Sequence, residues 1–266
     1  MSDTQKKACA ALRIMSSNIL FDKSLADRLP LIADYYLASG ADIIGMQEVN
    51  GVGSGLYAKV SGVYTPLAVA HADGKRCFSP ILYRTDRFGV VECGSELHRK
   101  RATDTKSMAW AVLCDRGTGK RVALINTHSA IILPSHKLNA TNSVEGEAWR
   151  LDNVIAMLEK RDELLDRYGK ELPVFICGDF NSKLGCDSIE AMRLHMSDSA
   201  DVAVVSSTHN VCSYHGAPGR GCTVGSPIDF IFVTENVKIL THTIPTDEKA
   251  LAISDHCPVI VGAEIS

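Results

Sequence analysis

The chain has 266 residues, of which 45% are hydrophobic, and carries a formal net charge of −3. This slight acidity excludes a protein that coats nucleic acid through bulk positive charge, although acids gathered around a metal would lower the net charge by themselves. A mean hydropathy of +0.03, with no apolar stretch of membrane-spanning length, excludes an integral membrane segment. We therefore expect one domain over residues 1–266, with residues 1–11 as a flexible tail.

The cysteine pattern indicates buried thiols rather than disulfide bonds. There are nine cysteines, an odd number, and none belongs to a C-x-x-C pair or to a zinc-like cluster. Cys114, Cys177 and Cys257 lie in or beside apolar runs, where small buried thiols are common. Because residues 1–11 contain no apolar signal segment, we expect a cytoplasmic protein. We also expect a monomer.

Short apolar runs that fit buried strands recur along the chain, with few helical segments between them. In chain order, the expected strands are residues 12–20, 42–49, 80–84, 108–114, 122–127, 174–180, 228–233 and 258–265. The expected helices are residues 25–39, 143–168 and 188–196, with Gly40 and Gly169 as stop signals. Arg150, on the longest helix, is expected at the surface. Many strands with few, unevenly spaced helices favour a mixed α/β architecture over a regular βαβ wind.

Acids, amides and imidazoles gather where these strands end or begin. In chain order they are Asn18, Glu48, His128, Asp179 with Asn181, Asp229, and Asp255 with His256. A buried strand that serves only packing has no use for such groups, so their concentration predicts a functional site at one rim of the sheets. Each residue alone has a duller explanation as a turn cap, a surface acid or a structural histidine, but together they favour hard-metal chemistry.

The oxygen donors suit a magnesium ion, with Mn²⁺ as a possible substitute. Mg²⁺ prefers oxygen ligands and keeps several waters, so one carboxylate such as Glu48 is sufficient. Asn18, Asp179 and Asp255 are further oxygen donors for the same site. A metal held in this way polarises a phosphoryl oxygen and activates water for in-line attack.

The histidines supply what a metal does not. His128 and His256 would donate hydrogen bonds to phosphate oxygens and transfer protons near neutral pH. A buried carboxylate such as Asp229 would fix the tautomer of one of these histidines. The residue types therefore predict a metal-dependent phosphoester hydrolase.

The same motifs resemble those of the endonuclease/exonuclease/phosphatase family, a superfamily of metal-dependent phosphoesterases. The resemblance covers nearly the whole chain: SSNIL around Asn18, GMQEV around Glu48, INTHS around His128, CGDFNS around Asp179, PIDFIFV around Asp229 and SDHCPV around Asp255. The family implies a four-layer α/β sandwich, in which two mixed β-sheets pack face to face and helices lie outside.

The resemblance also implies a role for each motif. Glu48 would hold the metal, helped by Asn18 and Asp255. Asp179 would align or deprotonate the attacking water, and Asn181 would hold the phosphate. His128 and His256 would stabilise the transition state, and Asp229 of the PIDF motif would orient His256. The number of metals and the identity of the base vary within the family and stay open here.

Departures from subfamily signatures are informative. The GDFN motif followed by Ser182 resembles nocturnin-like, deadenylase-like and many bacterial members, and Thr127 to Ala130 resembles the deoxyribonuclease and deadenylase arrangement. The tryptophan that precedes the GD motif in inositol polyphosphate phosphatases is absent, as is their W-x-D-R signature. Thr127 to Ala130 lacks the tyrosine and asparagine expected of abasic-site endonucleases. Neutral sphingomyelinases share GDFN and SDH, but the chain lacks an obvious aromatic membrane hairpin.

Residues outside the motifs are candidates for substrate binding. Arg99, Arg101 and Lys106 belong to a basic segment before the 108–114 strand, which would contact phosphates or lie in a solvated loop. Tyr214 and His215 lie shortly before the PIDF motif, and Tyr214 would stack on a base or pack its own loop.

We therefore expect a Mg²⁺-dependent phosphodiester hydrolase, a nuclease or nucleotide phosphodiesterase, with a nucleic acid or nucleotide as its partner. The first alternative is a phosphomonoesterase or a phospholipase-like, sphingomyelinase-like hydrolase of small-molecule or lipid phosphoesters. The second alternative is a catalytically inactive binding module on the same fold. Loops 50–63, 132–142 and 208–225 would set the substrate, and they carry no readable code.

Overall fold

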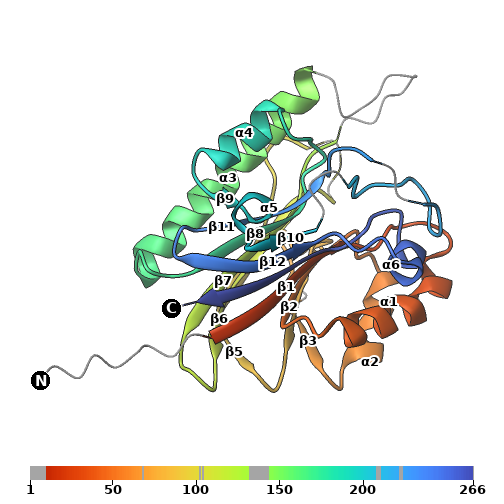
Figure 1. The fold of residues 1–266 in the computed structure, drawn as a ribbon, viewed down its shortest axis with the longest axis horizontal. Helices are drawn as coiled ribbons and strands as arrows, with labels where there is room; N and C mark the ends of the chain where they lie inside the picture. The colour runs from red at the N-terminus through yellow and green to blue at the C-terminus, as the bar shows by residue number, and fades with distance from the viewer. Residues whose placement is uncertain are drawn as a thin grey trace, which may run out of the picture.

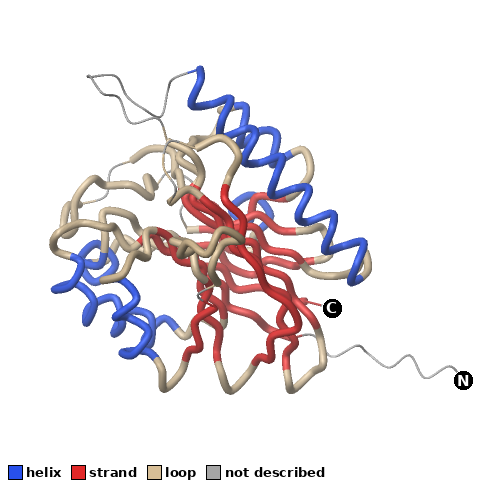
Figure 2. Tube along the Cα trace, turned by 180° about the vertical axis from the view of Figure 1, so that it is seen from behind, coloured by secondary structure: helices blue, strands red, loops and turns tan. Residues whose placement is uncertain are grey.

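The chain folds into two β-sheets packed face to face, with helices on both outer sides (Figures 1 and 2). The computed structural model describes residues 10–67, 69–101, 103, 105–131, 144–207, 211–221 and 224–265. The predicted four-layer α/β sandwich is confirmed. Strand β1 begins at Ala10, inside the predicted tail, and residues 1–9 lie outside the described ranges. No helix in the described ranges is long and apolar enough to cross a membrane.

The larger sheet has seven strands in the order β10-β12-β13-β1-β2-β4-β3. They are β1 (Ala10–Asn18), β2 (Ile43–Gln47), β3 (Tyr64–Leu67), β4 (Ile81–Arg84), β10 (Val205–Ser206), β12 (Val237–Thr243) and β13 (Val259–Ile265). β1 runs parallel to β2 and antiparallel to β13. The C-terminal ends of β1 and β2 therefore share a rim with the start of β13.

The smaller sheet has six strands in the order β5-β6-β7-β8-β11-β9. They are β5 (Phe88–Leu97), β6 (Ser107–Asp115), β7 (Arg121–His128), β8 (Val174–Asp179), β9 (Ser197–Asp198) and β11 (Asp229–Val233). β8 is parallel to β7 and antiparallel to β11, and this register sets Asp179 beside both His128 and Asp229. Three predicted site residues thus become neighbours through strand pairing alone.

Helices cover both outer faces of the sandwich (Figure 1). The seven-stranded sheet packs against α1 (Leu25–Ser39), α2 (Leu56–Val60) and α6 (Glu248–Ile253), with the 3-10 turn η1 (Gly53–Gly55) between α1 and α2 in sequence. The six-stranded sheet packs against α3 (Val144–Tyr168) and α4 (Asp187–Arg193). The short α5 (Ser199–Val202) follows β9. Loops gather at one end of the sandwich, as Figure 2 shows.

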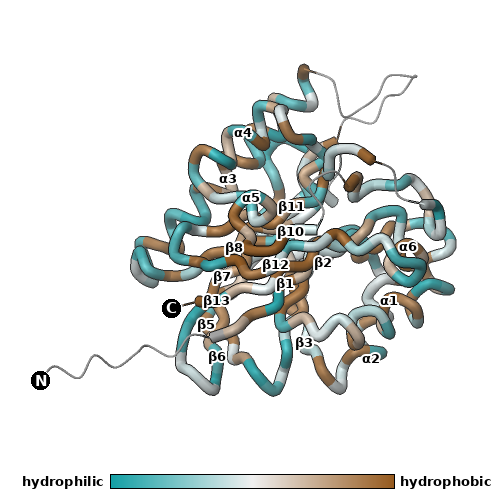
Figure 3. The backbone as a smooth tube through the Cα atoms, in the orientation of Figure 1, coloured by the Kyte–Doolittle hydropathy of each residue, from teal (hydrophilic) through white to brown (hydrophobic). Residues whose placement is uncertain are grey.

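Alternation along the strands builds the buried core. On β7, Leu124 faces the opposite sheet while Ile125 faces α3, where Met157 packs. On the other side, Ile32 of α1 packs against the seven-stranded sheet. Figure 3 shows hydrophobic residues concentrated along the strands. Each fully buried aliphatic side chain contributes roughly 1.5–3 kcal/mol, so these interfaces hold the layers together.

A buried polar contact joins the two sheets near the rim that carries the predicted site. Gln47 Nε2 of the larger sheet donates to Asn126 Oδ1 of the smaller sheet at 2.7 Å, and Asn126 Nδ2 donates to the Met46 carbonyl at 2.7 Å. Gly45 makes room for this contact, because a Cβ there would lie 2.6 Å from both Asn126 Oδ1 and Cys177 Sγ. The close approach of the sheets at this point therefore requires glycine.

Cys177 illustrates the buried thiols that the sequence predicts. Its side chain is fully buried between the sheets. Burial raises the pKa of the Cys177 thiol to about 12, so the group stays protonated and packs as a small hydrophobe.

The structure departs from the sequence prediction at particular elements. β5 is an edge strand on which Val90 and Val91 are exposed, so no apolar run marks it. β12 contains an irregularity in register between Ile239 and Thr241, which breaks its alternation. The surface position predicted for Arg150 is wrong: the residue is 1% exposed, and its Nη2 lies 2.9 Å from Glu147 Oε2. Its charge is buried because a carboxylate one turn earlier on α3 pairs with it.

Gly178 in β8 offers a test of the packing at the centre of the smaller sheet. Its φ is +147°, and a Cβ there would lie 2.0 Å from the Thr127 carbonyl oxygen. We expect Gly178→Ala to lower the free energy of unfolding by at least about 2 kcal/mol, from backbone strain and overpacking. Urea denaturation measures this. Gly62→Ala is the matched control, since nothing lies within 4 Å of a Cβ there, and an equally small effect of both changes would contradict the account.

Candidate active site

The predicted site residues of both sheets converge on one rim of the sandwich. The larger sheet contributes the end of β1, the residue after β2 and the residues before β13, which are Asn18, Glu48, Asp255 and His256. The smaller sheet contributes the ends of β7 and β8 and the start of β11, which are His128, Asp179 and Asp229. A cleft of about 520 Å³ opens there, and Glu48, His128, Asp179, Asn181, Asp255 and His256 line it.

Unusual backbone conformations cluster at the same strand ends. Leu20, Glu48 and Asn181 have φ values of 53°, 64° and 50°, and no other non-glycine residue in the described ranges has a positive φ. Each such residue costs on the order of 1–3 kcal/mol. The strain brings backbone N–H groups to site oxygens: Leu20 N donates to Asn18 Oδ1 at 3.0 Å and Asn181 N to Asp179 Oδ1 at 2.9 Å.

Glu48 and Asn18 form a hydrogen-bonded corner at the edge of the cleft. Asn18 Nδ2 donates to Glu48 Oε1 at 3.3 Å, and the Phe21 backbone N–H donates to Glu48 Oε2 at 2.7 Å. Burial acts to raise the pKa of Glu48, but the charge of His128 and the bond from Phe21 outweigh it and hold the pKa below its usual range. Glu48 is therefore ionised at neutral pH.

Asp179 is a buried carboxylate that several cations and donors face. Its Oδ2 lies 3.2 Å from His128 Nε2, 3.9 Å from His256 Nε2 and 3.1 Å from Asn18 Nδ2. Burial acts to raise the pKa of Asp179, but the nearby imidazoles of His128 and His256 and the ammonium of Lys106 lower it overall. The group is therefore an anion held in place from several sides.

His256 is oriented by a buried chain of hydrogen bonds. Its Nδ1 lies 2.8 Å from Asp229 Oδ2, and the same oxygen accepts a bond from Ser213 Oγ at 2.6 Å. This arrangement leaves His256 Nε2 directed towards Asp179 and Asp255, each 3.9 Å away. Burial acts to lower the pKa of His256, but Asp229 foremost raises it to about 10. The imidazole is therefore charged at neutral pH.

Lys106 lies inside the cleft, although the sequence placed it only in a basic segment. The residue is 6% exposed, and its ammonium contacts His128 Nε2. Burial lowers the pKa of Lys106 to about 8, opposed by the charges of Asp179 and Glu48. A signal for this position exists in the strand pairing, because the next residue, Ser107, begins β6 and lies opposite His128.

The rest of the described lining consists of apolar and aromatic side chains with two threonines, Thr103 and Thr105. Phe21, Phe78, Ile131 and Ile228 contribute to the cleft, and none of them was predicted as a site residue. Tyr214, which was predicted, is 45% exposed and its ring centroid lies 5.0 Å from that of His256. The cleft therefore combines a charged floor with aromatic side chains.

Other predicted substrate-binding residues lie outside this described lining. Arg99 is 74% exposed and faces Glu159 of α3 at 3.7 Å, and Arg101 donates to the His98 carbonyl at 2.7 Å. His215 is buried, and its backbone N–H donates to the Asp255 carbonyl at 2.8 Å. His215 thus supports the loop that carries Asp255 rather than lining the cleft. The predicted loop 132–142 lies outside the described residues.

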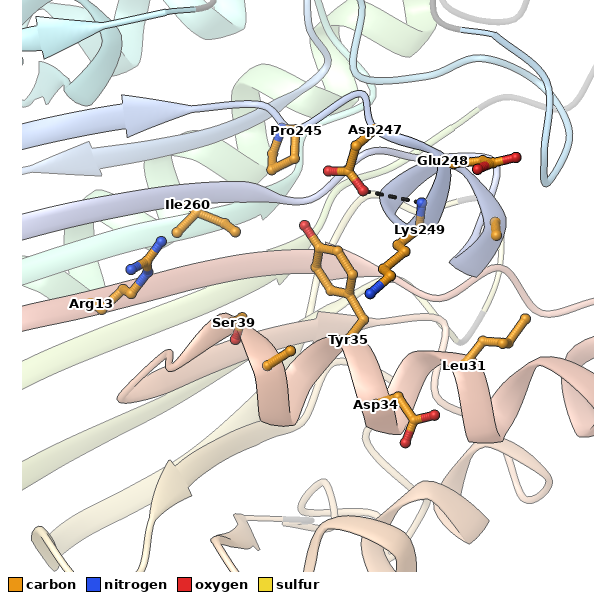
Figure 4. A pocket seen from close by; sticks show the side chains of 12 residues that line it. Arg13, Leu31, Asp34, Tyr35, Ser39, Pro245, Asp247, Glu248, Lys249 and Ile260 are labelled. Atoms are coloured by element: carbon orange, nitrogen blue, oxygen red, sulfur yellow. Dashed lines mark hydrogen bonds between the residues drawn. The ribbon is translucent and has the colours of Figure 1, made fainter.

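A second cleft, of about 580 Å³, lies between α1 and α6 on the outer face of the larger sheet. Figure 4 shows the Tyr35 ring between Arg13 and Lys249. Acids also line this cleft, among them Asp34 and Asp247, so its charges are mixed. It contains none of the predicted site residues. Chemistry rather than size therefore identifies the candidate active site.

Two sets of side chains could hold a metal. Asp179, Asp229 and His256 offer ligand atoms within 4.8 Å of one another. Within this group, however, Asp229 Oδ2 already bonds His256 Nδ1 and Ser213. The second set is the corner of Glu48 and Asn18 with Asp255, whose pKa burial raises. The charge of His256, 3.9 Å away, offsets this loss of solvation only in part, so the Asp255 carboxylate fits a site that a hard metal would complete.

The charge on His256 yields a test that needs no substrate. In chelator-treated protein, Asp229→Asn should lower the pKa of His256 by more than about one unit, because the nearest opposite charge is lost. Two-dimensional NMR titration of the imidazole measures this. In the wild type, protonated His256 stabilises the fold fully below its usual pKa of 6.5, and this contribution is lost as the pH rises through about 10.

Asp86→Asn is the matched control, because Asp86 pairs with Arg84 at the surface, away from the cleft. It should leave the His256 titration unchanged. A His256 pKa that stayed near 10 in Asp229→Asn would show that another group holds the charge.

Comparisons with solved structures agree with this fold. Among solved structures, an endonuclease/exonuclease/phosphatase family protein from Bacteroides thetaiotaomicron is 24% identical with a TM-score of 0.80, over 97% of this chain and 99% of that chain. A mannosyl-6-phosphatase from the same bacterium is 24% identical with a TM-score of 0.77, over 95% and 99%. The human nocturnin catalytic domain is 16% identical with a TM-score of 0.73, over 96% and 95%. These likenesses show the fold alone.

The sequence match is decisive for the family. No curated protein matches the chain. The model of the Endonuclease/Exonuclease/phosphatase family matches residues 15–256, which include every predicted metal-binding and catalytic residue. Enzymes of this family are hydrolytic, metal-dependent phosphoesterases. The chain therefore belongs to the endonuclease/exonuclease/phosphatase family.

Proposed function

We propose that the chain is a Mg²⁺-dependent phosphoester hydrolase that promotes in-line attack of water on a phosphoryl group bound in the cleft. One observation carries the proposal: the ionised Asp179 carboxylate lies between the hydrogen-bonded corner of Glu48 and Asn18 and two imidazoles. Asn18 Nδ2 is 3.1 Å from its Oδ2, and His128 Nε2 is 3.2 Å from the same atom. Metal donors, a water-orienting anion and phosphate donors thus meet within one cleft.

Glu48, Asn18 and Asp255 would hold the metal. Mg²⁺ bound there would polarise the phosphoryl group and offset the charge that develops in the transition state. Glu48 fits this role because it is ionised and half-buried, and because the Phe21 N–H fixes its Oε2 at 2.7 Å. Fixed, hard oxygen donors suit Mg²⁺, which tolerates little distortion of its coordination geometry.

Asp179 would orient the attacking water by accepting a hydrogen bond from it. Its low pKa makes it a weak base but an effective, permanently charged acceptor for a water O–H. Asn181, whose N–H donates to Asp179 Oδ1 at 2.9 Å, lines the cleft beside it and would bind the phosphate. The nucleophile and the phosphate would then be held by adjacent residues of one turn.

The two histidines would donate hydrogen bonds to phosphoryl oxygens. His256 is held by Asp229, so its Nε2–H points into the cleft, where negative charge develops. His128 Nε2 faces the same space from the other sheet. Asp229 Oδ2 bonds His256 and Ser213, and Asp229 is outside the described lining of the cleft, so it would be a positioning residue.

The cleft fits a small phosphoester better than a polymer. Arg99 and Arg101, which would grip a nucleic acid, lie outside the described lining. Tyr214 and Phe21 are exposed at the cleft and would contact a ring or an apolar group next to the phosphate. A nucleotide and a sugar phosphate both fit this description, and one of the similar solved structures is a mannosyl-6-phosphatase. The inactive binding module has no support, since every residue that the reaction needs is present.

Metal dependence is the first test of the proposal. Purified protein should hydrolyse 4-nitrophenyl phosphate or its bis ester with Mg²⁺, lose activity with chelator and regain it when Mg²⁺ is restored. Glu48→Gln should raise the Mg²⁺ concentration for half-maximal activity by about tenfold or more, because a charged ligand is lost. Release of 4-nitrophenol at an undiminished rate in the presence of chelator would refute the proposal.

Loss of a transition-state group is the second test. Asp179→Asn and His256→Ala should each lower kcat by about 10³-fold or more while circular dichroism stays unchanged. The control is His195→Ala, an exposed histidine two residues after α4 that is outside the described lining of the cleft. Near wild-type kcat in either site variant would remove that residue from the mechanism.

A further inference from the structure

Lys106 is a buried cation that no carboxylate neutralises directly. It is 6% exposed, and no ion pair joins its ammonium to any acid in the described part of the chain. The nearest hydrogen-bonding atom is His128 Nε2. Burying an ammonium without a bonded anion is costly, so the position calls for an anion that arrives from outside the chain.

The hydrogen bonds around His128 are in conflict when no anion is present. An ammonium only donates, and an ionised carboxylate only accepts. His128 Nε2 contacts the Lys106 ammonium and also lies 3.2 Å from Asp179 Oδ2. One ring nitrogen cannot accept from Lys106 and donate to Asp179 at once. An acceptor oxygen placed between Lys106 and a protonated His128 would satisfy both donors.

We propose that Lys106 binds a non-bridging phosphoryl oxygen together with His128, and that it favours a terminal, dianionic phosphate over a diester. This inference rests on the proposed function and adds a phosphate-binding residue and a substrate class to it. Lys106 is the single lysine or arginine in the described lining of the cleft. A fixed cation attracts a phosphomonoester dianion about twice as strongly as a diester monoanion at the same distance.

A buried wall lies behind Lys106, whose carbonyl accepts a hydrogen bond from the His98 backbone N–H at 3.2 Å. His98 Nε2 and Thr127 Oγ1 lie 2.9 Å apart, and both residues are buried beside His128. Burial lowers the pKa of His98 to about 3, so this wall is neutral. This wall therefore adds no second cation beside Lys106.

Kinetics with two esters test the inference. Lys106→Met should lower kcat/KM for 4-nitrophenyl phosphate by roughly 10- to 100-fold, as expected for a lost charge-assisted bond. The loss for bis(4-nitrophenyl) phosphate should be at least about threefold smaller, because this substrate carries one charge fewer. The matched control is Lys59→Met, an exposed lysine of α2 outside the cleft, which should change neither. Equal losses for both esters, or none, would overturn the proposal.

Binding of inorganic phosphate provides a readout that does not depend on turnover. By calorimetry, Lys106→Met should weaken phosphate binding about tenfold or more, and unchanged affinity would overturn the proposal. A crystal structure of the wild type with phosphate should place Lys106 Nζ within hydrogen-bonding distance of a phosphate oxygen. Phosphate bound without that contact would also overturn it. If the wild type hydrolysed neither ester with Mg²⁺, the proposed function would fail, and these two measurements would still decide the role of Lys106.

Discussion

Hydrogen bonds between polar side chains of opposite sheets hold the functional rim together. Asn18 of the larger sheet bonds Asp179 of the smaller one at 3.1 Å, and His256, before β13, bonds Asp229 of β11 at 2.8 Å. The buried Gln47–Asn126 bond lies just beneath them. Neither sheet alone has a complete site, so the reaction chemistry depends on how the two sheets are packed. Glycine at position 45 permits that packing, because any side chain there would push the sheets apart.

The charges at this rim form a balanced set. Asp179 and Glu48 stay ionised because cations and N–H donors face them, and His256 stays protonated because Asp229 is bonded to it. Such buried groups destabilise a fold unless their partners are fixed. In this chain the buried charged groups lie at strand ends, where the positive φ angles of Leu20, Glu48 and Asn181 add backbone strain. Function and local instability therefore occupy the same part of the molecule, while the apolar layers elsewhere supply the stability.

Local patterns predicted a mixed α/β architecture and polar residues at the strand ends, and the family resemblance implied the four-layer sandwich. Residues such as Asp179 stand at the end of an apolar run, and strand pairing then sets them beside their partners. The outer parts were harder to predict because they depend on tertiary contacts. Arg150 is buried because Glu147 on the same helix pairs with it. The irregular register of β12 breaks the alternation that would have predicted the strand. Arg99 pairs with Glu159 of α3 instead of lining the cleft. The sequence alone predicts Lys106 only as part of a basic segment, because its position beside His128 depends on the pairing of β6 with β7.

The central claim is that one sheet holds a metal through Glu48 while the other presents Asp179 to water and phosphate. The most direct measurement is the anomalous scattering of a crystal soaked in Mn²⁺, a heavier substitute for Mg²⁺. The account predicts a peak at roughly 2 Å from a Glu48 carboxylate oxygen, and its loss in Glu48→Gln. A peak enclosed by Asp179, Asp229 and His256 instead, or no peak at this rim, would contradict it.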